Sequence, residues 1–177
     1  MALNLLNLDQ AIRQLMLKEI DVDINSGKLY ISTRLSLAGA KDYPVLLKEA
    51  VKSHDDSWLA DQLNKPGKFN TTETRNTKSG TVTAKVPYNA NEVLAEGEFN
   101  RFYLRALCVF AQENSISKLV AYRAKQVSNP RPESEAMIGQ SIDPAKLIDD
   151  LRTKIGVDTA LGLPAGPNSG LSAKLPE

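Results

Sequence analysis

One segment constrains the fold of this chain more than any other. Residues 91–113 read NEVLAEGEFNRFYLRALCVFAQE, and their large apolar side chains recur at three- and four-residue steps. A helix that is apolar around most of its circumference has to be enclosed by other elements. We therefore predict a long central helix here, and we expect its residues Phe102, Leu107 and Phe110 to lie in the core of the domain.

Further helices are predicted around this one. Apolar residues at helical spacing, preceded by capping residues, indicate a helix over residues 8–25. The same signals indicate helices that start at Pro44, at Asp55 or Asp56, and at Pro144, since proline is favoured at a first helical position. The central helix would then have several helical neighbours to bury its apolar face.

A small sheet is predicted from short segments in which apolar and polar residues alternate. These segments are Lys28–Ser32, Thr81–Val86 and Lys118–Ala124. Residues 128–135 (SNPRPESE) contain two prolines and are expected to form an extended linker. The sequence thus predicts an α+β fold: a helix-rich single domain around a long central helix, with a small, mostly antiparallel sheet.

Two segments have too few apolar residues to belong to this core. Residues 65–80 (KPGKFNTTETRNTKSG) contain one large apolar residue, Phe69, and are expected to form an exposed polar arm. Residues 161–177 (LGLPAGPNSGLSAKLPE) are rich in Gly and Pro and are expected to form an extended C-terminal tail. Residues 1–160 would then form the compact domain.

The tail is predicted to hold a neighbouring subunit rather than its own domain. Its residues 162–177 carry three large apolar residues, Leu163, Leu171 and Leu175, which could serve as anchors on a neighbour together with Phe69 of the arm. Residues 171–175 could instead add as a strand to an exposed sheet edge, because that takes main-chain hydrogen bonds and few side chains. Either way, we expect deletion of residues 162–177 to leave the domain folded.

Composition and charge bear on the classes of partner. The chain of 177 residues has 22 Lys and Arg against 21 Asp and Glu, so its net charge is close to zero. A protein that holds duplex nucleic acid through phosphate contacts usually has a clear basic excess. No run of about eighteen apolar residues occurs, so no membrane partner is expected. One cysteine, Cys108, cannot form an internal disulfide, which fits an intracellular protein.

No residues form a recognisable catalytic or metal-binding pattern. His54 is the only histidine, and Asp55 and Asp56 beside it are expected to cap a helix rather than orient a general base. Cys108 lies within the most apolar segment and is expected to be buried, whereas a reactive thiolate needs exposure and a positive neighbour. We therefore expect no enzymatic activity, no cofactor and no bound metal.

Two groups of charged residues leave alternatives open. Residues 118–131 concentrate basic side chains and could contact nucleic acid, or they could form an ordinary charged strand edge. The central helix carries charges that must be paired, either inside the protein or across an interface, if that helix is enclosed. The basic group comprises Lys118, Arg123, Lys125 and Arg131, and the helical group comprises Glu96, Glu98, Arg101 and Arg105.

Three stretches carry a resemblance to a class of known proteins. They are the arm at 65–80, EGEFNRFYLRAL at 96–107, and GPNSGLSAKLPE at 166–177. The layout resembles small structural proteins of tailed-bacteriophage virions, of the neck, connector or capsid-associated type, in which a compact body carries extended arms. The resemblance implies a non-enzymatic assembly subunit that binds copies of itself and neighbouring structural subunits. It also implies a location in the host cytoplasm during assembly, or in the virion.

Overall fold

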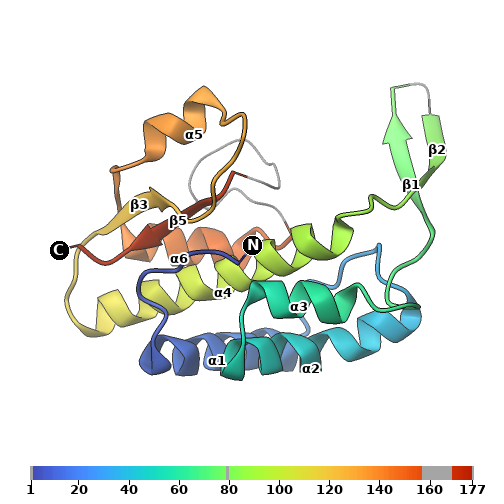
Figure 1. The fold of residues 1–177 in the computed structure, drawn as a ribbon. Coiled ribbons are helices and arrows are strands. Elements are labelled where there is room, and N and C mark those ends of the chain that lie inside the picture. The colour runs from blue at the N-terminus through green and yellow to red at the C-terminus, as the bar shows by residue number, and fades with distance from the viewer. Residues whose placement is uncertain (1, 79, 157–168, 177) are drawn as a thin grey trace.

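The computed structural model describes residues 2–78, 80–156 and 169–176 (Figure 1). It confirms an α+β fold in which one long helix, α4, is accompanied by shorter helices and small antiparallel sheets. The elements of these residues, in chain order, are α1 (Gln10–Asn25), α2 (Leu37–Ser53), α3 (Asp56–Leu63), β1 (Thr72–Thr77), β2 (Gly80–Lys85), α4 (Ala90–Glu113), β3 (Leu119–Arg123), α5 (Pro132–Met137), β4 (Ser141–Ile142), α6 (Pro144–Thr153) and β5 (Leu171–Lys174).

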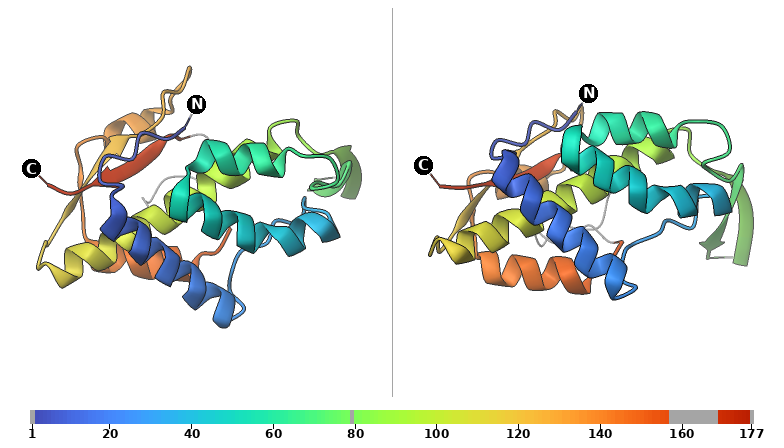
Figure 2. Two further views of the ribbon diagram at one scale, coloured as in Figure 1. Left: turned by 60° about the horizontal axis from the view of Figure 1, so that its bottom comes forward. Right: turned by 90° about the horizontal axis from the view of Figure 1, so that it is seen from below.

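Helix α4 lies at the centre of the molecule. Helices α1, α3 and α6 pack directly against it, and α1 runs between α2 and α6 in the view from below (Figure 2). Phe102 and Leu107 are fully buried, as predicted, whereas Phe110 is only half-buried where it packs against the core. The apolar width of this segment therefore did identify the central helix.

Side-chain caps fix where several helices begin. The Asp9 carboxylate accepts the Ile12 amide at the start of α1, and Asp55 does the same for Trp58 at the start of α3. Asp143 caps α6 and is followed by Pro144, as the sequence predicted. The predicted start of α2 at Pro44 was wrong, because Ser36 caps that helix and Pro44 lies inside it.

The strands form two sheets. One consists of β1 and β2, and the second has the order β4-β3-β5, with β4 and β5 both antiparallel to β3. Strand β5 comes from the segment predicted to be a free tail. In the register, Val120 faces Lys174 and Arg123 faces Leu171. The strand also packs on α4, where Asn100 Nδ2 donates to the Leu171 carbonyl.

The tail prediction was therefore wrong for Leu171 and Leu175. Leu171 is 3% exposed, and Leu175 is partly buried against the same core, with its amide donating to Asn7 Oδ1. The small residues Ser172 and Ala173 let the strand approach α4 closely, so main-chain pairing compensates for its low apolar content. Leu163 lies outside the described residues. Because β5 pairs with β3 and packs on α4, we now expect removal of residues 162–177 to destabilise the domain.

Two other local predictions were also wrong. Residues 28–32 form no strand, because the amides of Lys28 and Leu29 both donate to the Asp23 carbonyl and wrap the chain around the end of α1. Residues 128–135 are not wholly extended, since α5 begins at Pro132. A proline blocks a helix interior but is favoured in the first turn, which is where Pro132 stands.

Candidate protein-interaction site

The predicted polar arm is largely a regular β-hairpin. Strands β1 and β2 pair antiparallel in a register that runs from Thr72 opposite Lys85 to Thr77 opposite Gly80. Thr residues are frequent in both strands, and their β-branched side chains favour extended backbone. The sequence predicted an exposed arm over 65–80, and the strand residues of that arm are largely exposed, although its regular pairing with 80–85 was not predicted.

This hairpin stands away from the body of the protein (Figure 1). Only Glu73 and Ala84 among its strand residues are half-buried, and the others are exposed. No third strand or helix of the described chain covers either of its faces. A two-stranded hairpin without a covering layer is marginally stable in water. The hairpin is therefore an element whose surface and edges are free for another molecule.

Contacts at its base hold the hairpin on the body. Arg34 Nε lies 2.5 Å from Glu73 Oε2, and Arg75 Nε lies 2.6 Å from Glu73 Oε1. Hydrogen bonds from Arg34 and Arg75 lower the pKa of Glu73, so this carboxylate is charged at neutral pH. The Asn70 amide donates to the Arg34 carbonyl, and Asn70 Nδ2 donates to the Leu35 carbonyl. These bonds fix the hairpin at its base although its strands are exposed.

Helix α2 approaches this base closely. The Ser36 amide donates to the Lys68 carbonyl, and Ser36 Oγ donates to the Gly67 carbonyl. A Cβ atom at Gly39 would lie 2.0 Å from the Lys68 oxygen, so only glycine allows this approach. The start of α2 therefore belongs to the same end of the molecule as the hairpin.

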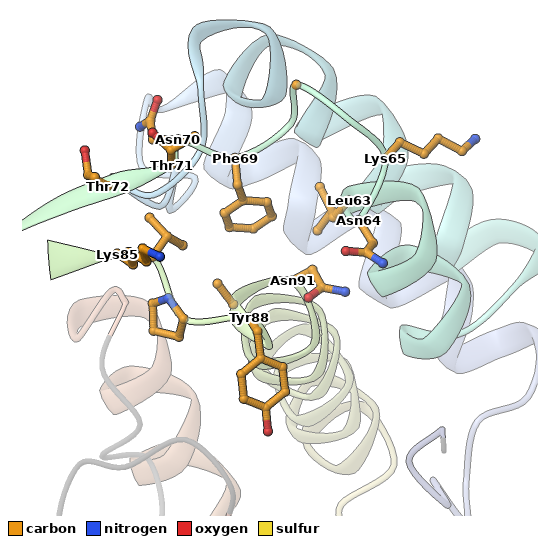
Figure 3. Close-up of a pocket in the computed structure, with 14 residues that line it drawn as sticks. Leu63, Asn64, Lys65, Phe69, Asn70, Thr71, Thr72, Lys85, Tyr88 and Asn91 are labelled. Carbon is orange, nitrogen blue, oxygen red and sulfur yellow. The ribbon is translucent and has the colours of Figure 1, made fainter.

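A pocket of about 420 Å³ opens beside the hairpin base (Figure 3). Leu63, Phe69 and Asn91 stand around the opening, with the Tyr88 ring at its edge. The wall combines apolar side chains with amides, an arrangement common where proteins bind one another. Phe69, which the sequence predicted to contact a partner, thus lines this pocket.

The two most exposed large apolar residues of the described chain lie at this end. Tyr88 is 96% exposed, and Leu37, the first residue of α2, is 94% exposed. Val82 on β2 is also exposed. We call the hairpin 72–85, the pocket, Leu37 and Tyr88 together the hairpin end. Sequence reasoning missed Leu37, Val82 and Tyr88, and only the position of Tyr88 beside Pro87, in a turn, gave any signal of exposure.

The basic segment 118–131 does not form a continuous basic patch. Arg123 is paired with Glu135 at 2.5 Å and donates to the Ser169 carbonyl, which leaves its side chain 11% exposed. Lys125 is paired with Glu96. Lys118 and Arg131 are exposed but stand at opposite ends of the segment. Two of the four predicted nucleic-acid contacts are therefore already engaged with carboxylates.

The charges of α4 are paired inside the protein. Arg105 is 1% exposed and donates to Glu19 Oε2 at 2.8 Å and to Asp23 Oδ2 at 2.6 Å. Arg152 of α6 donates to the same Glu19 carboxylate at 2.6 Å. This arginine–carboxylate cluster joins α1, α4 and α6. The buried charges therefore do not require a partner molecule.

A second buried ion pair lies one turn away on α4. Glu98 Oε1 lies 3.4 Å from Arg101 Nε, and burial raises the pKa of Glu98 to about 7. Arg101 Nη1 donates to the carbonyls of Leu151 and Lys154 at the end of α6. Arg101 thereby satisfies carbonyl groups that the end of a helix leaves without an intrahelical donor.

The contacts of His54 and Cys108 are those of residues that stabilise the fold. His54 follows α2, stacks on Trp58 with ring centroids 4.3 Å apart, and comes no closer than 4.0 Å to the Glu49 carboxylate. The Asp55 carboxylate beside it is used as a cap, as predicted. Cys108 is fully buried, and burial raises the pKa of its thiol to about 12, so no thiolate is available at neutral pH.

The described residues contain no cluster of three or more His, Cys, Asp and Glu side chains that could hold a metal ion. Within the same part of the chain, no helix has the length and apolar character needed to cross a membrane. The chain matches no protein-family model, and comparison with curated proteins and with solved structures finds no similar protein. A functional assignment therefore depends on the geometry of the hairpin end.

Proposed function

We propose that this chain is a non-enzymatic structural subunit of a multi-subunit particle and that it binds neighbouring subunits through the hairpin end. The observation that carries the proposal is the hairpin itself, which is exposed on both faces and firmly anchored at its base. An exposed, anchored hairpin costs conformational freedom and gains little burial within its own chain. A neighbouring subunit that covers it would supply that burial.

The apolar residues of the hairpin end support the same proposal. Burial of a large apolar side chain contributes roughly 1.5–3 kcal/mol, and Leu37 and Tyr88 expose nearly all of that surface. Aromatic side chains such as Tyr88 and Phe69 are enriched in protein interfaces. The pocket next to Phe69 offers a place for one side chain of a partner to insert.

The particle we propose is a tailed-phage virion, in its neck, connector or capsid-associated parts. The combination of a compact helical body with a projecting arm supports this setting, although the arm is now the hairpin and not the tail. The subunit would be present in the host cytoplasm during assembly and afterwards in the virion. Its partners would be copies of itself and neighbouring structural proteins.

The proposal can be tested by removing the hairpin. Residues 72–85 would be replaced by a short Gly-Ser linker, and Val22→Ser would serve as a control because Val22 is an exposed apolar residue of α1. We expect the linker variant to keep the far-UV circular dichroism of the helices and nearly the parent melting temperature. It should lose association with candidate partner subunits in light-scattering mass measurements, whereas the control should not.

Two outcomes would contradict this function. One is a linker variant that associates as strongly as the parent, which would show that the hairpin end is not the interface. The other is a Val22→Ser variant that weakens association as much as removal of the hairpin does, which would place the interface on the helical face instead.

A further inference from the structure

The outer edge of β1 carries main-chain groups that its own sheet does not use. The Val86 amide donates to the Thr71 carbonyl, so Thr71 belongs to the hydrogen-bonded pairs of the hairpin. Since inward and outward groups alternate along an antiparallel strand, Glu73, Arg75 and Thr77 also bond toward β2. The N–H and C=O groups of the residues between them, at positions 72, 74 and 76, point away from β2.

That outer edge is accessible. Thr72, Thr74 and Asn76 are all exposed, and the hairpin stands clear of the helices (Figure 1). Proteins commonly protect such edges with proline, a bulge or a covering element. Within Thr72–Thr77 there is no proline, and each residue of β1 has one partner on β2, so the strand has no bulge.

We propose that two copies of this chain pair through the outer edges of their β1 strands, antiparallel, with Thr74 opposite Thr74 of the second copy. This inference rests on the proposed function and names the partner and the contact. The two hairpins would form one four-stranded sheet. Thr72 of each copy would face Asn76 of the other, so the outward main-chain groups at 72, 74 and 76 would all be bonded.

The charges of β1 favour this register. With Thr74 at the two-fold axis, Glu73 of each copy stands directly opposite Arg75 of the other. Opposite charges in directly facing pairs stabilise a sheet, and like charges in those positions destabilise it. Both side chains lie on the face that already holds the Arg34–Glu73–Arg75 contacts, so the four charges of the dimer would form one network.

Neighbouring registers are disfavoured by the same charges. A two-fold axis at position 73 would place Glu73 opposite Glu73, and an axis at position 75 would place Arg75 opposite Arg75. Both registers keep the hydrogen-bonding parity, so main-chain bonding alone does not exclude them. Of these three registers, charge favours the one with Thr74 at the axis, which is also the one that bonds the outward groups at 72, 74 and 76 together.

The free part of the outer edge begins at Thr72. The Asn70 amide, which lies on the same edge, donates to the Arg34 carbonyl, and Leu35 forms an antiparallel bridge with Phe69. The body of the protein therefore covers the edge at 69–70, and the interface between the two copies would comprise positions 72–76.

Cysteine cross-linking tests the pairing directly. Residues facing each other in a hydrogen-bonded pair have Cα atoms about 5.5 Å apart, a separation that suits a disulfide. We expect Thr74→Cys to give a covalent dimer under mild oxidation at low protein concentration. Thr83→Cys is the matched control, because Thr83 faces Thr74 across the hairpin and lies on the outer edge of β2. Cys108 is buried and should not interfere.

Charge reversal tests the register. Arg75→Glu gives an acidic edge and Glu73→Arg a basic edge, so each variant alone would face like charges. We expect each to dimerise at least about tenfold more weakly than the parent, and an equimolar mixture to recover dimers, because every facing pair is then opposite in sign. The measurement is sedimentation equilibrium, with circular dichroism to confirm that each variant is folded.

Several results would overturn the pairing. One is equal cross-linking of Thr74→Cys and Thr83→Cys, and another is a mixture of the charge variants that stays monomeric. A parent protein that is monomeric at all concentrations and gives no Thr74→Cys dimer would also overturn it. If the linker variant then still lost its association with other subunits, the proposed function would stand while self-pairing fell. If removal of the hairpin changed no association at all, both would fall.

Discussion

Replacement of Glu98 by glutamine should stabilise the protein at neutral and alkaline pH. Glu98 is buried beside Arg101, and burial raises its pKa to about 7. The folded protein therefore holds a proton on this carboxyl group over a pH range in which the unfolded chain has released it. Glutamine has the same shape as the protonated acid and keeps an oxygen that can accept from Arg101, but it never becomes charged.

The magnitude follows from the difference between the two proton affinities. In the unfolded chain the pKa of Glu98 is near 4.5, its ordinary value, against about 7 in the folded state. Stability falls as pH rises through this window, because the folded state binds more protons than the unfolded state. A tenfold change in affinity corresponds to about 1.4 kcal/mol, so the full cost above pH 7 is roughly 3 kcal/mol. Below pH 4.5 both states are protonated and the cost vanishes.

Urea denaturation at a series of pH values is the appropriate assay. We expect Glu98→Gln to gain up to roughly 3 kcal/mol of unfolding free energy at pH 8 relative to the parent, and little at pH 4. Glu92→Gln, at an exposed position of α4, should show no such pH-dependent gain. A Glu98→Gln variant that is less stable than the parent at pH 8 would refute the reasoning, since the charged pair with Arg101 would then outweigh the burial of Glu98.

Three further predictions follow from the buried residues. Arg105→Leu should lose about 3–5 kcal/mol at pH 7 in urea denaturation, because Asp23 would be left buried without its arginine; Arg152→Leu, at a more exposed position, should lose about 1 kcal/mol or less. Leu171→Ala should cost about 2–5 kcal/mol by the same measurement, and an unchanged stability would mean that β5 does not hold the domain. Cys108 should react with a thiol reagent no faster than the protein unfolds. The reaction is followed by absorbance at a series of denaturant concentrations, and a rapid reaction of the native protein would contradict the burial of Cys108.

The helical part of the fold was largely predictable from the sequence. The density of apolar residues in the α4 segment predicts a buried helix. Asp143-Pro144 predicts the start of α6, because aspartate caps helices and proline is favoured at the first helical position. Such signals are local, since each depends on residues within a turn or two of one another. Pro44 shows the limit of this logic, because a proline within a helix is tolerated when the surrounding packing compensates for the lost bond.

The second sheet and the candidate interaction site were less predictable because they depend on long-range contacts. Residues 171–175 could be expected to add to a sheet edge, but nothing in the four residues of β5 shows that the edge is β3 of the same chain, with Asn100 of α4 beside it. Phe69 could be singled out as the one large apolar residue of a polar arm. The exposure of Leu37 could not, because the sequence does not show which face of a helix the rest of the chain leaves uncovered.

The arginine–carboxylate cluster of Arg105 also has a consequence for folding kinetics. Its members are separated by 86 residues between Glu19 and Arg105 and by 133 residues between Glu19 and Arg152. Contacts of such sequence separation form only after large loops have closed, which places them late on the folding pathway. Interactions absent from the transition state act mainly on the unfolding rate. The cluster should therefore slow unfolding: it adds little to the rate at which the protein folds, but it lengthens the lifetime of the folded state.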